Sequence, residues 1–135
     1  MEKEFVKYNQ ALALKELGFD EPCFKGYTEE YKTLISFANT HTNTSVKNTL
    51  PTKPFTAPTY SAAFRWFREK HGLLHDITLT LNINDELESF YILIHKLNGL
   101  VMNEDDDIEL NVKTTNKEEA ESACLDKLIE ICKNK

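Results

Sequence analysis

The stretch "DITLTLNINDELESFYILIHKL", residues 76–97, decides the fold class. Its first part alternates strictly between aliphatic and polar side chains, which is typical of a half-buried strand. The predicted apolar face is made of Ile77, Leu79, Leu81 and Ile83. "NDELE" (84–88) supplies a turn, and "SFYILIHKL" (89–97) is apolar on both faces, as central strands are. "IELNVK" (108–113) alternates again, so the sequence predicts an antiparallel meander of three strands.

Three helices are predicted around this sheet. The first covers residues 4–17 and ends at Gly18, and the second covers 59–71, with Thr59 as N-cap and Gly72 as its stop. The third begins at the capping box formed by Thr115 and Glu118. Its predicted buried stripe consists of Ala120, Cys124, Leu125, Leu128, Ile129, Ile131 and Cys132.

The chain between the first two helices is less regular. "FDEPCFKGY" (19–27) is predicted to be a turn-rich linker and "YKTLISF" (31–37) a short strand. Residues 38–58 are rich in Asn, Thr and Pro and are predicted to form a long irregular loop. Residues 31–68 contain no acid, so this region is locally basic. The prediction is one α+β domain, 1–135, ordered α–loop–α–β–β–β–α, with the three-stranded antiparallel sheet packed on helices.

Composition limits the classes of function. A net charge of -6 argues against a broad nucleic-acid-binding face, which needs clustered Lys and Arg. We see no apolar run long enough to span a bilayer and no secretory signal pattern. Three cysteines without a C-x-x-C pair are typical of small buried thiols in a reducing compartment, so we expect a cytoplasmic protein.

Trp66 poses the main question about function. At about 100° per residue, the core arc of helix 59–71 contains Tyr60, Ala63, Phe64, Phe67 and His71. Trp66 falls outside that arc, together with Ala62 and Glu69. Two interpretations remain open at this point: another segment buries the indole, or Trp66 and Arg65 line a binding surface, where both residue types are enriched.

Catalytic and metal-binding patterns are weak in this sequence. His71, His75 and Asp76 lie close together without a familiar ligand spacing such as H-E-x-x-H. "NEDDDIE" (103–109) lacks the glycine of a calcium loop, so we expect a solvated turn. Cys23 has no histidine near it in the sequence. We therefore predict a non-catalytic protein with no metal and no cofactor.

Three segments resemble a known group of proteins. They are "ALALKELGFDEPCFKGY" (11–27), "APTYSAAFRWFREKHGL" (57–73) and "NKEEAESACLDKLIEICKNK" (116–135). Together they resemble small uncharacterised proteins of bacteriophages and Bacteroidetes genomes. The resemblance brings no mechanism; it implies a phage or mobile-element protein that acts in the bacterial cytoplasm.

Three functions follow as hypotheses. The first is a counter-defence protein that sequesters a small anionic ligand, such as a nucleotide immune messenger; its predicted ligand-binding residues are Arg65, Trp66, Arg68, Lys25, Tyr27 and Lys53. The second is a protein–protein adaptor or inhibitor of a host protein, and the third is a small hydrolase that uses Cys23 or the histidines. A homodimer is one economical way to cover the second face of the sheet.

Overall fold

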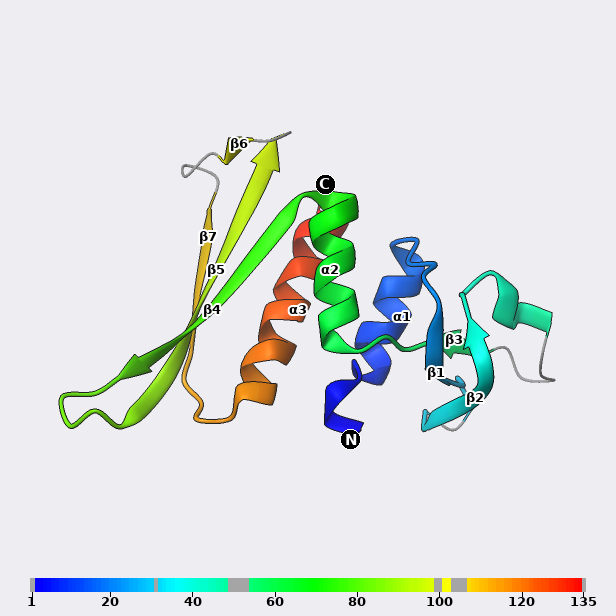
Figure 1. Ribbon diagram of the computed structural model, residues 1–135, viewed down its shortest axis with the longest axis horizontal. Coiled ribbons are helices and arrows are strands. Elements are labelled where there is room, and N and C mark those ends of the chain that lie inside the picture. Colours follow the sequence, from blue (N-terminus) through cyan, green and yellow to red (C-terminus); the bar gives the residue numbers. More distant parts are fainter. Residues whose placement is uncertain (1, 31, 49–53, 99–100, 103–106, 135) are drawn as a thin grey trace. The chain divides into compact units, whose positions relative to one another are not determined.

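The computed structural model describes residues 2–30, 32–48, 54–98, 101–102 and 107–134. The fold is of the mixed α+β class, with three α-helices and two antiparallel sheets among these residues (Figure 1). The chain divides into two compact units, Met1–Ala63 and Phe64–Asn134. Each unit has its own sheet and its own share of fully buried side chains, and the boundary falls within helix α2 (Tyr60–His71). The sequence predicted one of these sheets; a single-domain organisation stays a prediction.

The first unit packs a helix against a small sheet. Its elements are η1 (Glu2–Glu4), α1 (Tyr8–Glu16), β1 (Cys23–Tyr27), β2 (Leu34–His41), η2 (Ser45–Asn48) and β3 (Phe55–Thr56). The strand order is β2-β1-β3, and α1 packs against β1 and β3. The ring of Tyr8 on α1 meets the rings of Tyr27 and Phe55 edge-on, at centroid distances of 5.6 and 5.4 Å. Aromatic packing therefore joins this helix to its sheet.

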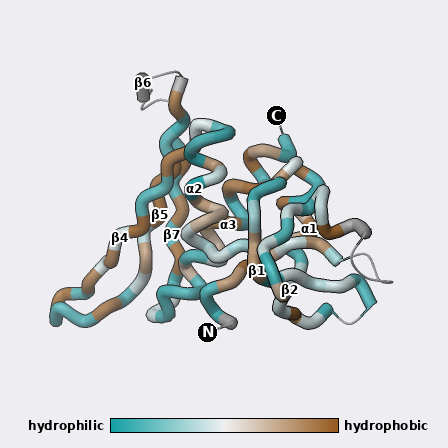
Figure 2. The backbone as a smooth tube through the Cα atoms, turned by 45° about the vertical axis from the view of Figure 1, so that its right-hand side comes forward, coloured by the Kyte–Doolittle hydropathy of each residue, from teal (hydrophilic) through white to brown (hydrophobic). Residues whose placement is uncertain are grey.

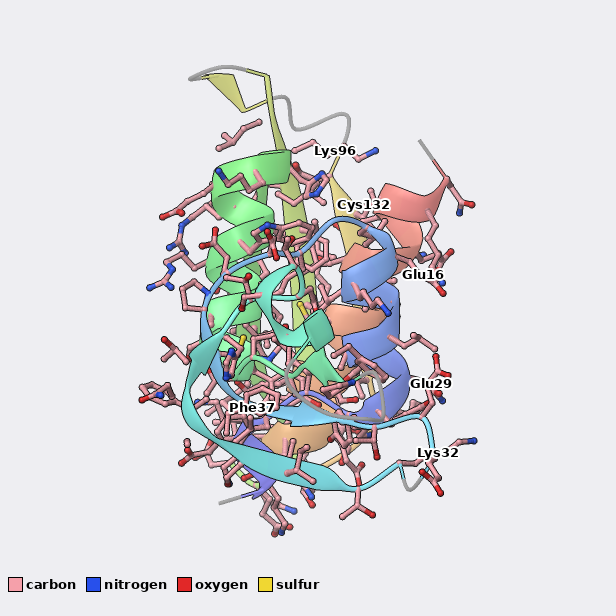
Figure 3. The ribbon with its side chains drawn as sticks, turned by 90° about the vertical axis from the view of Figure 1, so that its right-hand side faces the viewer. Glu16, Glu29, Lys32, Phe37, Lys96 and Cys132 are labelled. Carbon is pink, nitrogen blue, oxygen red and sulfur yellow. The ribbon has the colours of Figure 1, made fainter. Side chains whose placement is uncertain are left out.

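Residues 19–27 are not the predicted turn-rich linker, because strand β1 runs through their second half. Pro22 lies before the strand, and Gly26 lies within it, paired with Ile35 on one side and Thr56 on the other. A side chain at Gly26 would collide with the carbonyl of Phe55 and with the ring of Phe37, which is labelled on β2 in Figure 3. The glycine therefore marks a close approach inside a sheet rather than a turn.

The predicted irregular loop at 38–58 is also partly wrong, since it contains the end of β2, η2 and β3. The buried side chain of Asn43 explains why this segment has a regular structure. Its Nδ2 donates to the carbonyl of Phe19 at 2.7 Å, and its Oδ1 accepts from the N–H of Thr56 at 2.8 Å. Asp20 accepts from both the N–H and the hydroxyl of Thr44, each at 2.8 Å. Polar side chains that suggested a loop are therefore used in long-range hydrogen bonds.

The second unit contains the predicted meander, which the structure confirms. Its strands are β4 (Leu73–Leu81), β5 (Leu87–Asn98), β6 (Val101–Met102) and β7 (Ile108–Val112). β5 lies between β4 and β7, and its end also pairs with β6; all pairings are antiparallel. Helix α3 (Lys117–Lys133) packs on β4 and β5. From α2, the ring of Phe64 stacks on His75 of β4 with centroids 4.0 Å apart.

Both ends of α2 and the stop of α1 follow the sequence, but α1 begins at Tyr8 and not at residue 4, because Phe5 forms an isolated β-bridge with Thr59. Thr59 accepts from the N–H of Ala62 at 3.2 Å, and Gly18 and Gly72 both have positive φ, of 97° and 64°. The start of α3 is a correction: the cap is Asn116, whose side chain accepts from the N–H of Glu118 at 2.9 Å, and not Thr115. Asn has the stronger N-cap preference, so the helix begins one residue later than the capping box predicted.

Candidate functional site

The side chain of Trp66 is buried, so the interpretation that presented it outward is wrong. The indole is 6% exposed, and its ring centroid lies 5.0 Å from that of Phe67 and 4.7 Å from that of His71, both edge-on. On the helical wheel Trp66 lies only about 60° from Ala63. The buried arc of α2 is therefore wider than predicted and reaches this residue.

The other predicted ligand-binding residues are divided between the two units, so a site that they share stays a prediction. Arg65 and Arg68 are exposed and belong to the second unit, whereas Lys25 and Tyr27 belong to the first. Buried Tyr27 donates its hydroxyl to the carbonyl of Val6 at 2.8 Å, and the Nζ of Lys25 lies 4.9 Å from the ring centre of Phe5. Lys53 lies outside the described residues.

The thiols of Cys23 and Cys124 have the wrong protonation state for nucleophiles. Cys23, Cys124 and Cys132 are all free and buried. Burial raises the pKa of Cys23 to about 11 and that of Cys124 to about 12. A nucleophilic cysteine needs a lowered pKa, because the thiolate is the reactive form. The geometry around these two thiols therefore gives the hydrolase hypothesis no support.

Two of the histidines pack against aromatic rings, and a third contacts a carboxylate. His71 lies against Trp66, and His75 is stacked on Phe64. The Nδ1 of His95 lies 3.0 Å from the Oδ2 of Asp107. Residues 103–106 of the predicted acidic turn lie outside the described residues. The described residues hold no group of three potential metal ligands. Among the same residues, no helix is long and apolar enough to cross a membrane.

The most unusual surface is an apolar row formed by Leu73, Ile77, Leu79 and Leu81 of β4, interrupted by His75, and by Ile83 in the turn that follows the strand. Leu73 is buried and Ile77 is half-buried. Farther along the same row, Leu79 is 58% exposed, Leu81 50% and Ile83 97%. Figure 1 shows the β4–β5 hairpin projecting away from α3, and Figure 2 shows hydrophobic segments continuing to its tip. The exposure is confined to the outer strand: Phe90 of β5, which pairs with Leu79 on the same face, is 3% exposed. The cover on the helix side therefore ends before it reaches the outer edge of β4.

The sequence identified this row but not its exposure. The alternation predicts a half-buried strand, but of its predicted apolar face only Ile77 is half-buried, and the other three residues are exposed. The lengths of the elements indicate this exposure. Strand β5, with twelve residues, spans ~40 Å, whereas helix α2, also with twelve residues, spans ~18 Å. A ribbon this long cannot be covered by helices of that length.

The second face of the sheet is less apolar than β5 alone suggested. Leu93 lies on that face but is flanked by Asp76 on β4 and Glu109 on β7, both exposed. Tyr91 is flanked by Thr78 and Asn111, which are exposed as well. The face that was expected to need a cover is therefore mixed, and the exposed apolar surface lies on the helix side of the hairpin.

The outer edge of β4 is open. The N–H of Leu97 donates to the carbonyl of Gly72 at 2.8 Å, and the N–H of Asn82 donates to Glu86 at 2.9 Å. Because antiparallel ladders bond through alternate residues, the even-numbered residues of β4 direct their backbone groups to β5. The odd-numbered residues direct theirs to the other edge, where no strand in the described part of the chain pairs with β4.

Comparisons with known proteins found no matching family model, no matching curated protein and no matching solved structure. The resemblance to phage and Bacteroidetes proteins therefore stays a prediction. The site is defined by its own geometry: an open strand edge that is continuous with an exposed apolar row.

Removing the indole tests the burial of Trp66. Trp66→Ala should lower the free energy of unfolding by about 3–5 kcal/mol, as large-to-small core changes do. Arg65→Ala, the exposed neighbour, should change it by less than about 0.5 kcal/mol. Denaturant unfolding of the two variants makes the comparison, and similar small losses for both would contradict a buried indole.

His75 should make stability depend on pH. Burial lowers the pKa of His75 below its ordinary 6.5, and the nearby Arg68 guanidinium lowers it further. Above 6.5 the ring is neutral in both states and its stabilisation is complete; as pH falls through 6.5, the unfolded chain takes up the proton first. The free energy of unfolding should therefore decrease below that pH.

His75→Phe keeps an aromatic ring against Phe64 and removes the titration. Denaturant unfolding at about pH 7.5 and about pH 5.5 brackets the relevant window. The stability loss between these pH values should be smaller in the variant than in the wild type. Equal losses would show that His75 does not contribute.

Proposed function

We propose that this chain is a non-catalytic binding protein that acts through protein–protein contact. The supporting observation is the open edge of β4 beside the exposed side chains of Leu79, Leu81 and Ile83. Main-chain groups at such an edge bond to an added strand, and the side chains beside them supply specificity. A contiguous exposed apolar surface on a protein with a net charge of -6 is typical of an interaction site.

The lack of edge protection supports the same function. Natural edge strands are blunted by Pro, by Lys or by very short length. β4 has nine residues, "LLHDITLTL", with neither Pro nor Lys and with one acid, Asp76. An edge of this kind is hazardous unless a partner occupies it, so we infer that a strand of another chain binds here.

Sequestration of a small anionic ligand is less well supported. Its stacking residue, Trp66, is buried. Arg65 and Arg68 are still exposed, but Arg68 belongs to the basic last turn of α2. Cations at that position interact favourably with the helix dipole and need no ligand.

The biological setting is part of the proposal. Three free buried cysteines suit a reducing compartment, so we place the protein in the bacterial cytoplasm. There the protein would serve as an adaptor or an inhibitor of a host protein, as the resemblance to phage proteins suggests.

A photo-crosslinking residue tests the contact surface in cells. Benzoylphenylalanine in place of Leu79 should form covalent adducts with protein when bacteria that produce the chain are irradiated. The matched control is the same residue in place of Phe24, which is 65% exposed on β1 of the other unit. Adducts at position 79 and not at position 24 are expected. Equal labelling, or no adduct at position 79, would contradict the proposal.

A further inference from the structure

We propose that the strand bound at this edge is β4 of a second copy, so that the protein forms a two-fold dimer with one continuous sheet. This rests on the proposed function, because it names the partner of the same surface. The two β4 strands run antiparallel, with Leu79 of each copy at the two-fold axis. Leu79 then lies opposite Leu79, and Ile77 lies opposite Leu81 of the second copy.

The outward backbone groups of β4 can form hydrogen bonds in this register. The odd-numbered residues of β4 carry the outward N–H and C=O groups, as the bonds at Gly72 and Asn82 establish. A two-fold axis at Leu79 pairs odd residues only with odd residues across the new edge. Each outward donor of Ile77, Leu79 and Leu81 therefore meets an outward acceptor.

The side chains are self-complementary in the same register. On the helix side, Leu79 meets Leu79, Ile77 meets Leu81 and His75 meets Ile83 of the other copy. On the opposite face Thr78 meets Thr80. Asp76 meets Asn82, so no two like charges are opposed. Aliphatic pairs and Thr–Thr pairs are among the favourable cross-strand combinations.

Charge complementarity lies at the two ends of the interface. The exposed hairpin turn, with Asp85 and Glu86, would lie opposite the start of β4 in the second copy. Directly before that position is the last turn of α2, which carries Arg68, Lys70 and His71 together with one acid, Glu69. On each side of the axis, the acidic hairpin turn of one copy would therefore lie beside the basic end of α2 of the other copy.

A charge swap at Leu79 tests the dimer. The wild type should have roughly twice the 15.6 kDa mass of the chain in light scattering. Leu79→Lys and Leu79→Glu should each be monomeric, because like charges would face each other at the axis. An equimolar mixture of the two should return to the dimeric mass. Because Leu79 is 58% exposed, neither variant should unfold, which circular dichroism melting verifies.

Phe24→Lys is the matched control, since it introduces the same charge at another exposed apolar residue and should stay dimeric. A monomeric wild type, or a Leu79→Lys variant that stays dimeric, would overturn the proposal. If the wild type is monomeric but the probe at Leu79 captures a different protein in cells, the dimer fails and the proposed function stands. If the wild type is monomeric and the probe captures nothing, both fail.

Discussion

The structure depends on a mismatch in length between the strands and the helices of the second unit. Strand β5 spans ~40 Å, whereas α3, with seventeen residues, spans ~26 Å and α2 less. One side of the sheet is therefore covered only in part: Phe90 of β5 is buried, whereas its partner on β4, Leu79, is 58% exposed. Leu73 is buried, Ile77 is half-buried, and Leu79, Leu81 and Ile83 are exposed along one row. The contact surface follows from this geometry.

The sequence predicted those strands and helix ends that depend on patterns of neighbouring residues. Period-two alternation located β4 and β7, a doubly apolar run located β5, and Thr59 and Gly72 marked the ends of α2. These signals lie within a few residues of the feature they predict. The strand at 23–27 and the ordered segment around Asn43 depend instead on partners in distant parts of the chain. Composition could not reveal those contacts.

The candidate site was predicted less well than the fold. The helical wheel gave the correct centre of the buried face of α2 but too narrow a width, so Trp66 was placed outside it. The aliphatic row of β4 was identified, yet its exposure depends on where the covering helices end. Burial is a property of the assembled unit, and residue spacing alone does not determine it.

Charge is distributed in a way that suits an open strand edge. Residues 1–63 hold seven basic and seven acidic side chains, whereas residues 64–134 hold eight basic and fifteen acidic ones. The excess acid therefore belongs to the unit that carries the apolar row. Net charge opposes non-specific association, and complementary ends favour one orientation of a specific partner. Together these features allow an unprotected edge to stay selective.

Amide hydrogen exchange along β4 tests the central claim most directly. Thr78 and Thr80 bond to β5 within one chain, so their N–H groups should exchange slowly in the wild type and in Leu79→Lys. The outward N–H groups of Ile77 and Leu81 should exchange slowly in the wild type, where a second β4 accepts them, and rapidly in Leu79→Lys. Rapid exchange at Ile77 and Leu81 in both proteins would show that the edge has no partner, and would contradict the account.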